Sequence, residues 1–138
     1  MQQRLNFITL GVQHLDEMKK WYMDIFGWVP SQDSDGIVFF KLNGFMLSLF
    51  PAHELAEDIG IEDSGNGFKR FTCSVNFNST QEIDELFDAM RKKGVKIIKE
   101  PQKVYWGGYS GYIADPENNY WEFAFNPYIE LDAAGNVV

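Results

Sequence analysis

The feature that most constrains this chain is an internal repeat, because one order of predicted elements occurs twice along its 138 residues. Each copy begins with a strand, at residues 5–12 and 71–77, and continues with an amphipathic helix and three further strands. Repeats of this kind pack side by side, and each helix covers one face of its own sheet. The predicted fold class is therefore α+β, with two βαβββ repeats that form a curved mixed-sheet cup.

Hydrophobic spacing and turn residues set the boundaries in the first half. Apolar residues recur at helical spacing from Leu15 to Phe26, and Gly27 ends the helix. The other predicted elements are an extended segment at 28–30, a turn at 33–36, a strand at 37–42, a hairpin turn at Asn43-Gly44 and a strand at 45–50. Residues 52–68 form an acidic loop, with one short helical turn predicted at 54–58.

The second half repeats this plan. Ser79 and Glu82 form a capping box at the start of a helix that runs to Gly94. The remaining elements predicted here are strands at 96–99, 109–114 and 120–125, with a turn at 115–119 before the last of them. The core face of the strand at 71–77 is predicted to consist of Phe71, Cys73, Val75 and Phe77. The chain is thus predicted to be one domain, 1–138, made of halves at about 4–50 and 69–127.

Composition excludes several classes of function. Twenty Asp and Glu against twelve Lys and Arg give a formal charge of −8, which disfavours nucleic acid as a partner. No apolar stretch approaches the ~20 residues that span a bilayer, and the first residues do not resemble a secretory signal. We therefore expect a cytoplasmic protein with no membrane partner. The single cysteine, Cys73, cannot form an intrachain disulfide and is predicted to be a core thiol.

Two stretches of the sequence resemble a known superfamily. They are Trp106-Gly107-Gly108-Tyr109-Ser110-Gly111-Tyr112-Ile113-Ala114-Asp115-Pro116 with Tyr120-Trp121-Glu122-Phe123-Ala124, and Phe7-Ile8-Thr9-Leu10-Gly11-Val12 with Trp21-Tyr22 and Phe26-Gly27-Trp28. They are similar to the conserved segments of the vicinal-oxygen-chelate superfamily, which includes glyoxalases, bleomycin-resistance proteins and extradiol dioxygenases. The resemblance implies paired βαβββ units, frequent homodimers, and activities that range from lyases, isomerases and dioxygenases to proteins that only sequester antibiotics.

The resemblance also implies where a metal would bind. Metal-using members place His, Gln or Glu ligands on the first and last strands of each half, at positions that correspond here to Phe7, Ser48, Thr72 and Glu122. Only Glu122 is a good ligand, whereas a catalytic metal generally needs three protein ligands or more. His14, at the start of the first predicted helix, and His53, in the loop after Pro51, are each interpreted as a cap or a surface residue. No cofactor is expected, although a divalent metal held in an unusual way stays open.

Strand alternation predicts which side chains line the cup, since those on the faces opposite the helices would meet there. The predicted ligand-binding residues on the strands are Phe7, Thr9, Met46, Ser48, Phe50, Thr72, Ser74, Asn76, Tyr120 and Glu122, with Ala124 beside them. Such a mixture of aromatic groups and a few polar ones is typical of small-molecule sites. The alternative is that the aromatic rings simply fill the cup.

Glu122 is the candidate catalytic residue. A carboxylate among Phe7, Trp121 and Phe123 would be partly removed from water, which suits a general base or a group that binds an amine or hydroxyl. Alternatively, a neighbouring hydroxyl or backbone N–H satisfies it and it has only a structural role. Trp106, Tyr109 and Tyr112 complete the predicted ligand-binding set.

The glycine-rich segment Trp106-Gly107-Gly108-Tyr109 has two interpretations. It could cover the mouth of the cup and stack on a planar ligand, or its aromatic rings could pack under the loop. Two functional classes therefore remain open. One is a metal-free small-molecule-binding protein, and the other is an enzyme that uses Glu122 as a base or a non-standard metal site.

Overall fold

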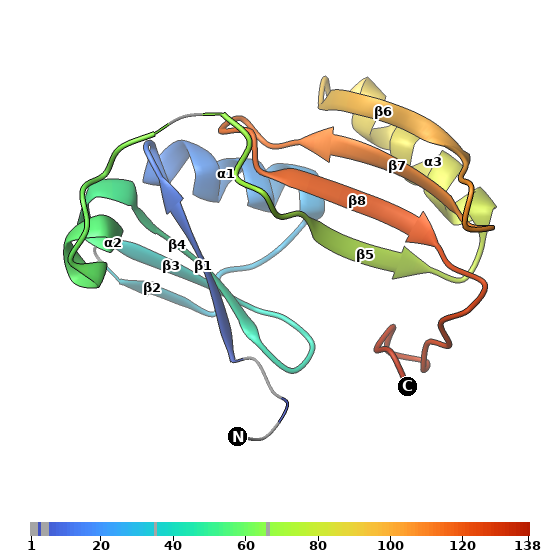
Figure 1. Ribbon diagram of the computed structural model, residues 1–138, viewed down its shortest axis with the longest axis horizontal. Helices are drawn as coiled ribbons and strands as arrows, with labels where there is room; N and C mark the ends of the chain where they lie inside the picture. The colour runs from blue at the N-terminus through green and yellow to red at the C-terminus, as the bar shows by residue number, and fades with distance from the viewer. Residues whose placement is uncertain (1–2, 4–5, 35, 66) are drawn as a thin grey trace. The chain divides into compact units, whose positions relative to one another are not determined.

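The structure, a computed structural model, describes residue 3 and residues 6–34, 36–65 and 67–138. It divides the chain into two compact units, Met1–Phe68 and Lys69–Val138 (Figure 1). Each unit contains one predicted βαβββ repeat and one four-stranded sheet, so the α+β class and the repeated order of elements are confirmed. Leu5, predicted to begin the first strand, lies outside the described residues. In the part of the chain that the structure describes, no helix has the length and apolarity needed to cross a membrane.

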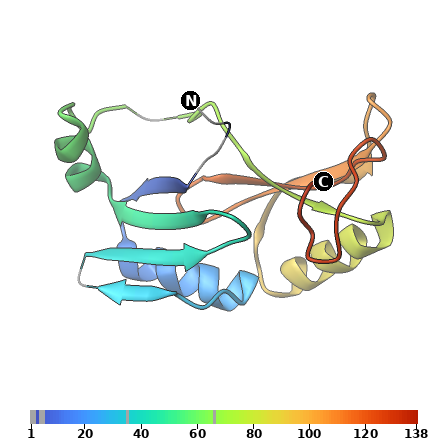
Figure 2. The same ribbon diagram turned by 90° about the horizontal axis from the view of Figure 1, so that it is seen from below.

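The first unit has strand order β1-β4-β3-β2. Its elements are β1 (Phe7–Val12), α1 (Leu15–Phe26), β2 (Gln32–Ser34), β3 (Ile37–Lys41), β4 (Met46–Pro51) and α2 (Ala52–Ile59). β1 pairs with β4 in parallel, whereas β3 pairs with β4 and with β2 in antiparallel fashion. Helix α1 covers one face of this sheet (Figure 2).

Alternation along the strands and helical spacing along α1 produce the core of the first unit. Leu10 of β1, Phe40 of β3 and Leu49 of β4 are buried on the side of the sheet that α1 covers. Met18 and Tyr22 of α1 are the buried residues that pack against this face. The helix ends at Gly27, which has the left-handed conformation (φ 68°) that favours glycine.

The second unit has the equivalent strand order, β5-β8-β7-β6. Its elements are β5 (Cys73–Phe77), α3 (Thr80–Lys92), β6 (Lys96–Lys103), β7 (Tyr109–Ala114) and β8 (Tyr120–Phe125). Here too the first and last strands pair in parallel, and the remaining pairs are antiparallel. The capping box is present, because the Ser79 hydroxyl accepts a hydrogen bond from Glu82 N–H and donates one to the Glu82 carboxylate.

Helix α3 packs Ile83, Phe87 and Met90 against the second sheet, and all three are buried. The Phe87 ring meets Phe123 of β8 edge to face, with centroids 6.1 Å apart. Gly111 of β7 lies under the same ring. A Cβ atom at Gly111 would be 2.6 Å from Phe87 Cζ and 2.9 Å from the Lys99 carbonyl oxygen, so only glycine fits between helix and sheet at this point.

Four boundaries predicted from the sequence are wrong. The short helical turn at 54–58 is a complete helix, α2, which starts directly after β4. Residues Asp33 and Ser34, predicted in a turn, belong to β2, and β6 extends to Lys103 rather than ending at residue 99. Phe71 is not a core residue, because β5 begins only at Cys73 and Phe71 is exposed.

The segment after β8, for which no structure was predicted, closes into a small turn. A bridge joins Leu131 and Val137. Between them the Asp132 carboxylate accepts hydrogen bonds from Ala134 N–H, Asn136 N–H and the Asn136 side-chain amide. The same bonds, at the same spacing, hold the turn that begins at Asp115 between β7 and β8. The hairpin turn predicted at residues 115–119 is therefore confirmed.

Candidate functional site

A row of polar side chains crosses the second sheet on the face opposite α3. The register of the strands places Lys99 of β6 opposite Tyr112 of β7, Tyr112 opposite Glu122 of β8, and Glu122 opposite Ser74 of β5. Side chains at directly opposed positions share a face, whereas their neighbours in sequence point to the other side. Trp121 and Phe123, on either side of Glu122, are accordingly buried in the core.

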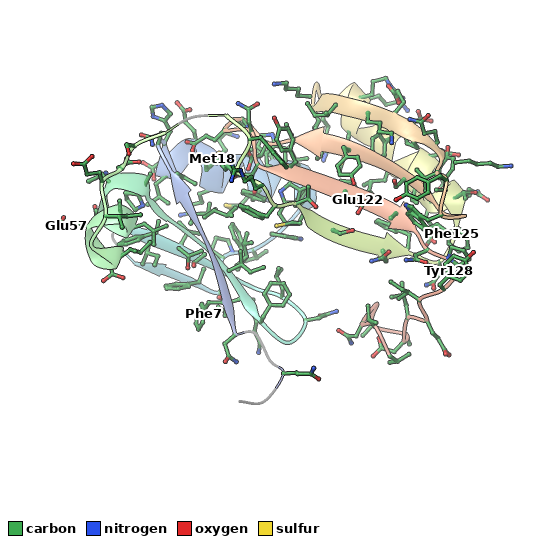
Figure 3. The ribbon with its side chains drawn as sticks, viewed as in Figure 1. Phe7, Met18, Glu57, Glu122, Phe125 and Tyr128 are labelled. Carbon is green, nitrogen blue, oxygen red and sulfur yellow. The ribbon has the colours of Figure 1, made fainter. Side chains whose placement is uncertain are left out.

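Glu122 is held by hydroxyl groups on both sides. The Tyr112 hydroxyl donates to Glu122 Oε1 at 2.8 Å, and the Ser74 hydroxyl donates to Oε2 at 3.0 Å. Figure 3 shows Glu122 near the middle of β8, with α3 behind the sheet. The structure therefore brings three predicted site residues, Ser74, Tyr112 and Glu122, together. The same hydroxyl groups would also satisfy Glu122 if its role were purely structural.

Tyr112 acts as a hydrogen-bond donor in this arrangement. Removal from water, followed by the hydrogen bond to Glu122 and the charge of that carboxylate, raises the pKa of Tyr112 to about 12. The phenol therefore keeps its proton at neutral pH and continues to donate it toward Glu122. Because Tyr112 orients one carboxylate oxygen and Ser74 the other, Glu122 is fixed without a metal ion.

An open groove with a volume of about 450 Å³ lies over this row. It is lined by Lys99, Gln102, Lys103, Val104, Tyr105, Trp106, Ser110, Tyr112 and Glu122. Three of these, Trp106, Tyr112 and Glu122, are predicted site residues. The polar groups of β6, namely Lys99, Gln102 and Lys103, were not predicted to belong to the site, and neither was Ser110.

Irregular pairing of β6 explains why its residues were missed. The register between β6 and β7 shifts between Ile97 and Lys99 and again between Lys99 and Gln102, so strict alternation fails there. As a result both Lys99 and Gln102 line the groove, although they are three residues apart. Pro101 is the signal in the sequence that indicates this irregularity, because proline within a sheet is confined to strand edges and bulges.

Trp106 packs against its own loop and also lines the groove. The turn is closed by Val104 N–H, which donates to the Gly108 carbonyl, and by Gly107 N–H, which donates to the Val104 carbonyl. A Cβ atom at Gly108 would lie 1.9 Å from the Trp106 ring, so the indole occupies the space that any other side chain would need. The interpretation that the ring packs on the loop is confirmed, whereas stacking on a ligand stays a prediction.

Tyr109 lies on the other side of the sheet from Glu122. Its hydroxyl donates to Asp84 of α3 at 2.6 Å. That hydrogen bond, together with burial and the charge of Asp84, raises the pKa of Tyr109 to about 12. Both residues line a separate groove of about 420 Å³ near the start of α3. Tyr109 therefore does not join the cluster around Glu122.

The predicted residues of the first unit form a second cluster. Thr9 and Ser48 are directly opposed on β1 and β4, and their hydroxyl oxygens are 2.7 Å apart. The ring of Phe7 meets Phe39 edge to face, with centroids 6.2 Å apart, and about half of the Phe7 surface is exposed. Met46 and Phe50 are half-buried on β4. This cluster is apolar and aromatic, apart from the paired hydroxyl groups.

The remaining predicted residues are dispersed along the second unit. Thr72 precedes β5 and is exposed, Asn76 is opposite Ala124, and Tyr120 is opposite Ala114. Of the four family metal positions, Phe7 and Ser48 belong to the first unit, and Thr72 and Glu122 to the second. Their convergence in one cup stays a prediction.

These four positions do not fit a divalent metal. Phenylalanine has no donor atom, and serine and threonine hydroxyls are weak ligands unless they lose their protons. The Ser48 hydroxyl already pairs with Thr9. Across residues 6–34, 36–65 and 67–138, no three His, Cys, Asp or Glu side chains are grouped so that they could hold a metal ion. His14 and His53 are both exposed, and His14 occupies the N-cap position of α1 without a capping hydrogen bond from its side chain.

We therefore expect the purified protein to hold less than one divalent ion per chain, because only Glu122 among the four positions offers a good ligand. Elemental analysis of untagged protein, purified without chelators and without metal-affinity resin, measures this directly. A stoichiometric zinc, nickel, manganese or iron ion that is lost in a Glu122→Gln variant would contradict the expectation.

Comparisons with known proteins identify the family. Residues 4–123 match the model of the glyoxalase/bleomycin resistance protein/dioxygenase superfamily. A glyoxalase-related enzyme from Fulvimarina pelagi is similar in structure with a TM-score of 0.86 and 30% identity, over 99% of this chain and 98% of that one. A search of curated protein sequences gives no match.

More distant solved structures share the fold. A glyoxalase/bleomycin resistance protein/dioxygenase from Nocardioides has a TM-score of 0.78 at 21% identity, over 91% of this chain and 84% of that one. Lactoylglutathione lyase from Agrobacterium tumefaciens has a TM-score of 0.71 at 23% identity, over 91% and 96%. From its match to the family model and from the Fulvimarina relative, the chain belongs to the glyoxalase/bleomycin resistance protein/dioxygenase superfamily.

Proposed function

We propose that this protein binds a small organic molecule in the groove over the second sheet, without a divalent metal, and that Glu122 recognises a cationic or hydrogen-donating group of that molecule. The observation that carries the proposal is the orientation of the Glu122 carboxylate by Tyr112 and Ser74 at the wall of a groove. A negative charge held in place by neighbouring donors is ready to bind a ligand without first having to reorganise.

The composition of the groove supports a role in binding. Trp106 supplies an aromatic surface, and Ser110 and Gln102 supply neutral polar groups beside the charge of Glu122. A small number of well-placed polar groups next to an aromatic ring is the usual make-up of a small-molecule site. Membership of the superfamily is compatible with this proposal, since one scaffold supports many functions.

An enzyme is the second candidate, and the Tyr112–Glu122 pair is the observation that favours it. A carboxylate 2.8 Å from a protonated phenol offers one group that can accept a proton and another that can donate one. Such a pair could move a proton in a lyase or isomerase reaction that needs no metal.

The Glu122→Gln variant tests the proposal and separates the two candidates. The amide keeps the size of the side chain but has no charge and accepts no proton at neutral pH. We expect the variant to fold normally and to bind amine-bearing ligands about tenfold more weakly, since a charge-assisted hydrogen bond contributes about 1.5 kcal/mol or more. The measurement is a thermal-shift screen of small aromatic, amine and thioester metabolites, followed by calorimetric titration of the hits.

Glu130→Gln is the matched control, because Glu130 is an exposed carboxylate outside the groove. It should leave every affinity unchanged. Hits that bind wild type and Glu122→Gln equally well would refute the assignment of the groove. An enzyme that uses Glu122 as its base would instead lose roughly 10²- to 10⁴-fold in turnover.

We also propose that the protein is a cytoplasmic homodimer. A single, half-buried cysteine suits a reducing compartment. Strands β1 and β5 are sheet edges within their own units, and such edges are often covered when two chains associate. Light scattering at micromolar concentration should give twice the chain mass of 15.9 kDa, and a result of 15.9 kDa would contradict the proposal.

A further inference from the structure

Two lysines of β6, Lys99 and Lys103, line the groove without a partner. Neither ammonium group makes a hydrogen bond or an ion pair within the part of the chain that the structure describes. Three other basic residues of the second unit are engaged: Lys69 and Lys96 donate to asparagine side chains, and Arg91 bridges Asp88 and Glu100. In a chain with a formal charge of −8, unpaired positive groups at a groove wall are a local exception to the general charge.

The irregular pairing of β6 shapes this wall of the groove. In a regular strand, the residue three positions from Lys99 would point away from the face that Lys99 shares with Tyr112. The second register shift instead places Gln102 opposite Ser110, and both of these residues line the groove with Lys99. Lys103 follows Gln102 and is opposite Tyr109, and it lines both this groove and the separate one near the start of α3. A bulge that redirects side chains in this way is a common device beside binding sites.

The positive and negative sides of the groove are separated by two strand spacings. Lys99 and Glu122 lie in the same row of the sheet with Tyr112 between them, so their backbones are about 10 Å apart. No ion pair between them is formed in the structure. The indole of Trp106 lines the same groove and presents an aromatic surface.

From this arrangement we infer that the groove selects a small, planar zwitterion. Its anionic group lies at Lys99 and Lys103, its body lies along Trp106, and its ammonium or other donor group meets Glu122. The inference rests on the proposed function, which concerns Glu122 alone, and adds the anionic half of the ligand. Lysine suits this role because its ammonium is a compact point charge on a flexible stem and can follow anions of different shape.

Three matched probes test the inference. 4-(Aminomethyl)benzoate carries both charges, 4-methylbenzoate carries only the anion, and 4-(aminomethyl)benzamide carries only the ammonium. Each is titrated into ¹⁵N-labelled protein by NMR, with the indole N–H signal of Trp106 as the reporter, assigned from a Trp106→Phe spectrum. The proteins compared are wild type, the Lys99→Gln/Lys103→Gln double variant, Glu122→Gln, and Lys92→Gln. The last removes one exposed charge from α3, away from the groove.

We expect the double lysine variant to bind both carboxylate probes about 3- to 10-fold more weakly and the benzamide unchanged, because each exposed ion pair contributes modestly. Glu122→Gln should instead weaken binding of the two probes that carry an ammonium group and leave 4-methylbenzoate unchanged. Lys92→Gln should match wild type for all three probes. Carboxylate affinities that survive in the double variant, or that fall equally in Lys92→Gln, would overturn the inference while leaving the proposed function intact. If no probe binds wild type at millimolar concentration, the proposed function fails and the inference fails with it.

Discussion

Replacing Gly111 with alanine should destabilise the second unit by about 2–3 kcal/mol, the cost typical of overpacking a core. The added methyl group would meet the Phe87 ring at 2.6 Å and the backbone at Lys99 and Pro101 at 2.9 Å. Two of these three contacts are backbone atoms, so rotation of a side chain cannot relieve them. Urea denaturation, followed by circular dichroism, should show a lower midpoint with an unchanged slope.

Gly11→Ala is the matched control, since Gly11 is also a strand glycine that faces a helix. Its new methyl group would lie 3.3 Å from both Ala52 Cα and Leu55 Cδ2, a distance that a small shift can accommodate. We expect it to cost less than about 1 kcal/mol. Equal midpoints for Gly111→Ala and Gly11→Ala would mean that β6 and α3 do not pack against Gly111 as described. Because Lys99 lies at the contact, Gly111→Ala should also weaken binding of carboxylate probes.

Replacing Asp115 with alanine should cost about 3 kcal/mol or more. The Asp115 carboxylate is buried and accepts hydrogen bonds from Glu117 N–H, Asn119 N–H and the Asn119 side-chain amide at 2.7–3.0 Å. Without it, donors around a buried asparagine lose their acceptor, and each unsatisfied donor costs roughly 1–3 kcal/mol. Thermal unfolding monitored by calorimetry should therefore show a markedly lower midpoint.

The second turn of this kind is a control within the same molecule. Asp132 makes an equivalent set of hydrogen bonds to Ala134 and Asn136, and those bonds hold the pKa of Asp132 below its usual value. Its position is far less buried, so water can replace the lost acceptor in Asp132→Ala. We expect little change in the unfolding midpoint. A similar decrease in the unfolding midpoint of Asp115→Ala and Asp132→Ala would show that the lost hydrogen bonds, rather than burial of the carboxylate, determine the loss of stability.

The repeated order of elements could be predicted because it depends on local patterns. The helical spacing that ends at Gly27, the capping box at Ser79 and the turn at Asp115 are each determined within a few residues, and the structure contains all three. Alternation likewise predicted that Glu122 and Ser74 share a face. The hydrogen bond between them follows from that register.

The side of the groove formed by β6 was missed, because it depends on how β6 pairs with β7 rather than on alternation within β6 itself. Alternation along residues 96–103 does not reveal the two register shifts that bring Lys99 and Gln102 to one face. In the structure, the close approach of Gly111 to Phe87 and to the β6 backbone at Lys99 and Pro101 lies at the second of these shifts. The length of helix α2 was underestimated for a related reason. Its segment contains few apolar residues and several acidic ones, so it resembles an acidic loop when its packing against β1 and β4 is not known.

The pairing of first and last strands affects how the chain is made. β1 finds its partner only when β4 has been synthesised, and β5 remains an open edge until β8 emerges. Such long-range parallel pairs close large loops, which slows folding compared with local hairpins. On the ribosome each unit can therefore complete its sheet only after its last strand, β4 or β8, has been synthesised. A chain that stops before Tyr120 would release β5 without the strand that carries Glu122, with an exposed edge prone to aggregation.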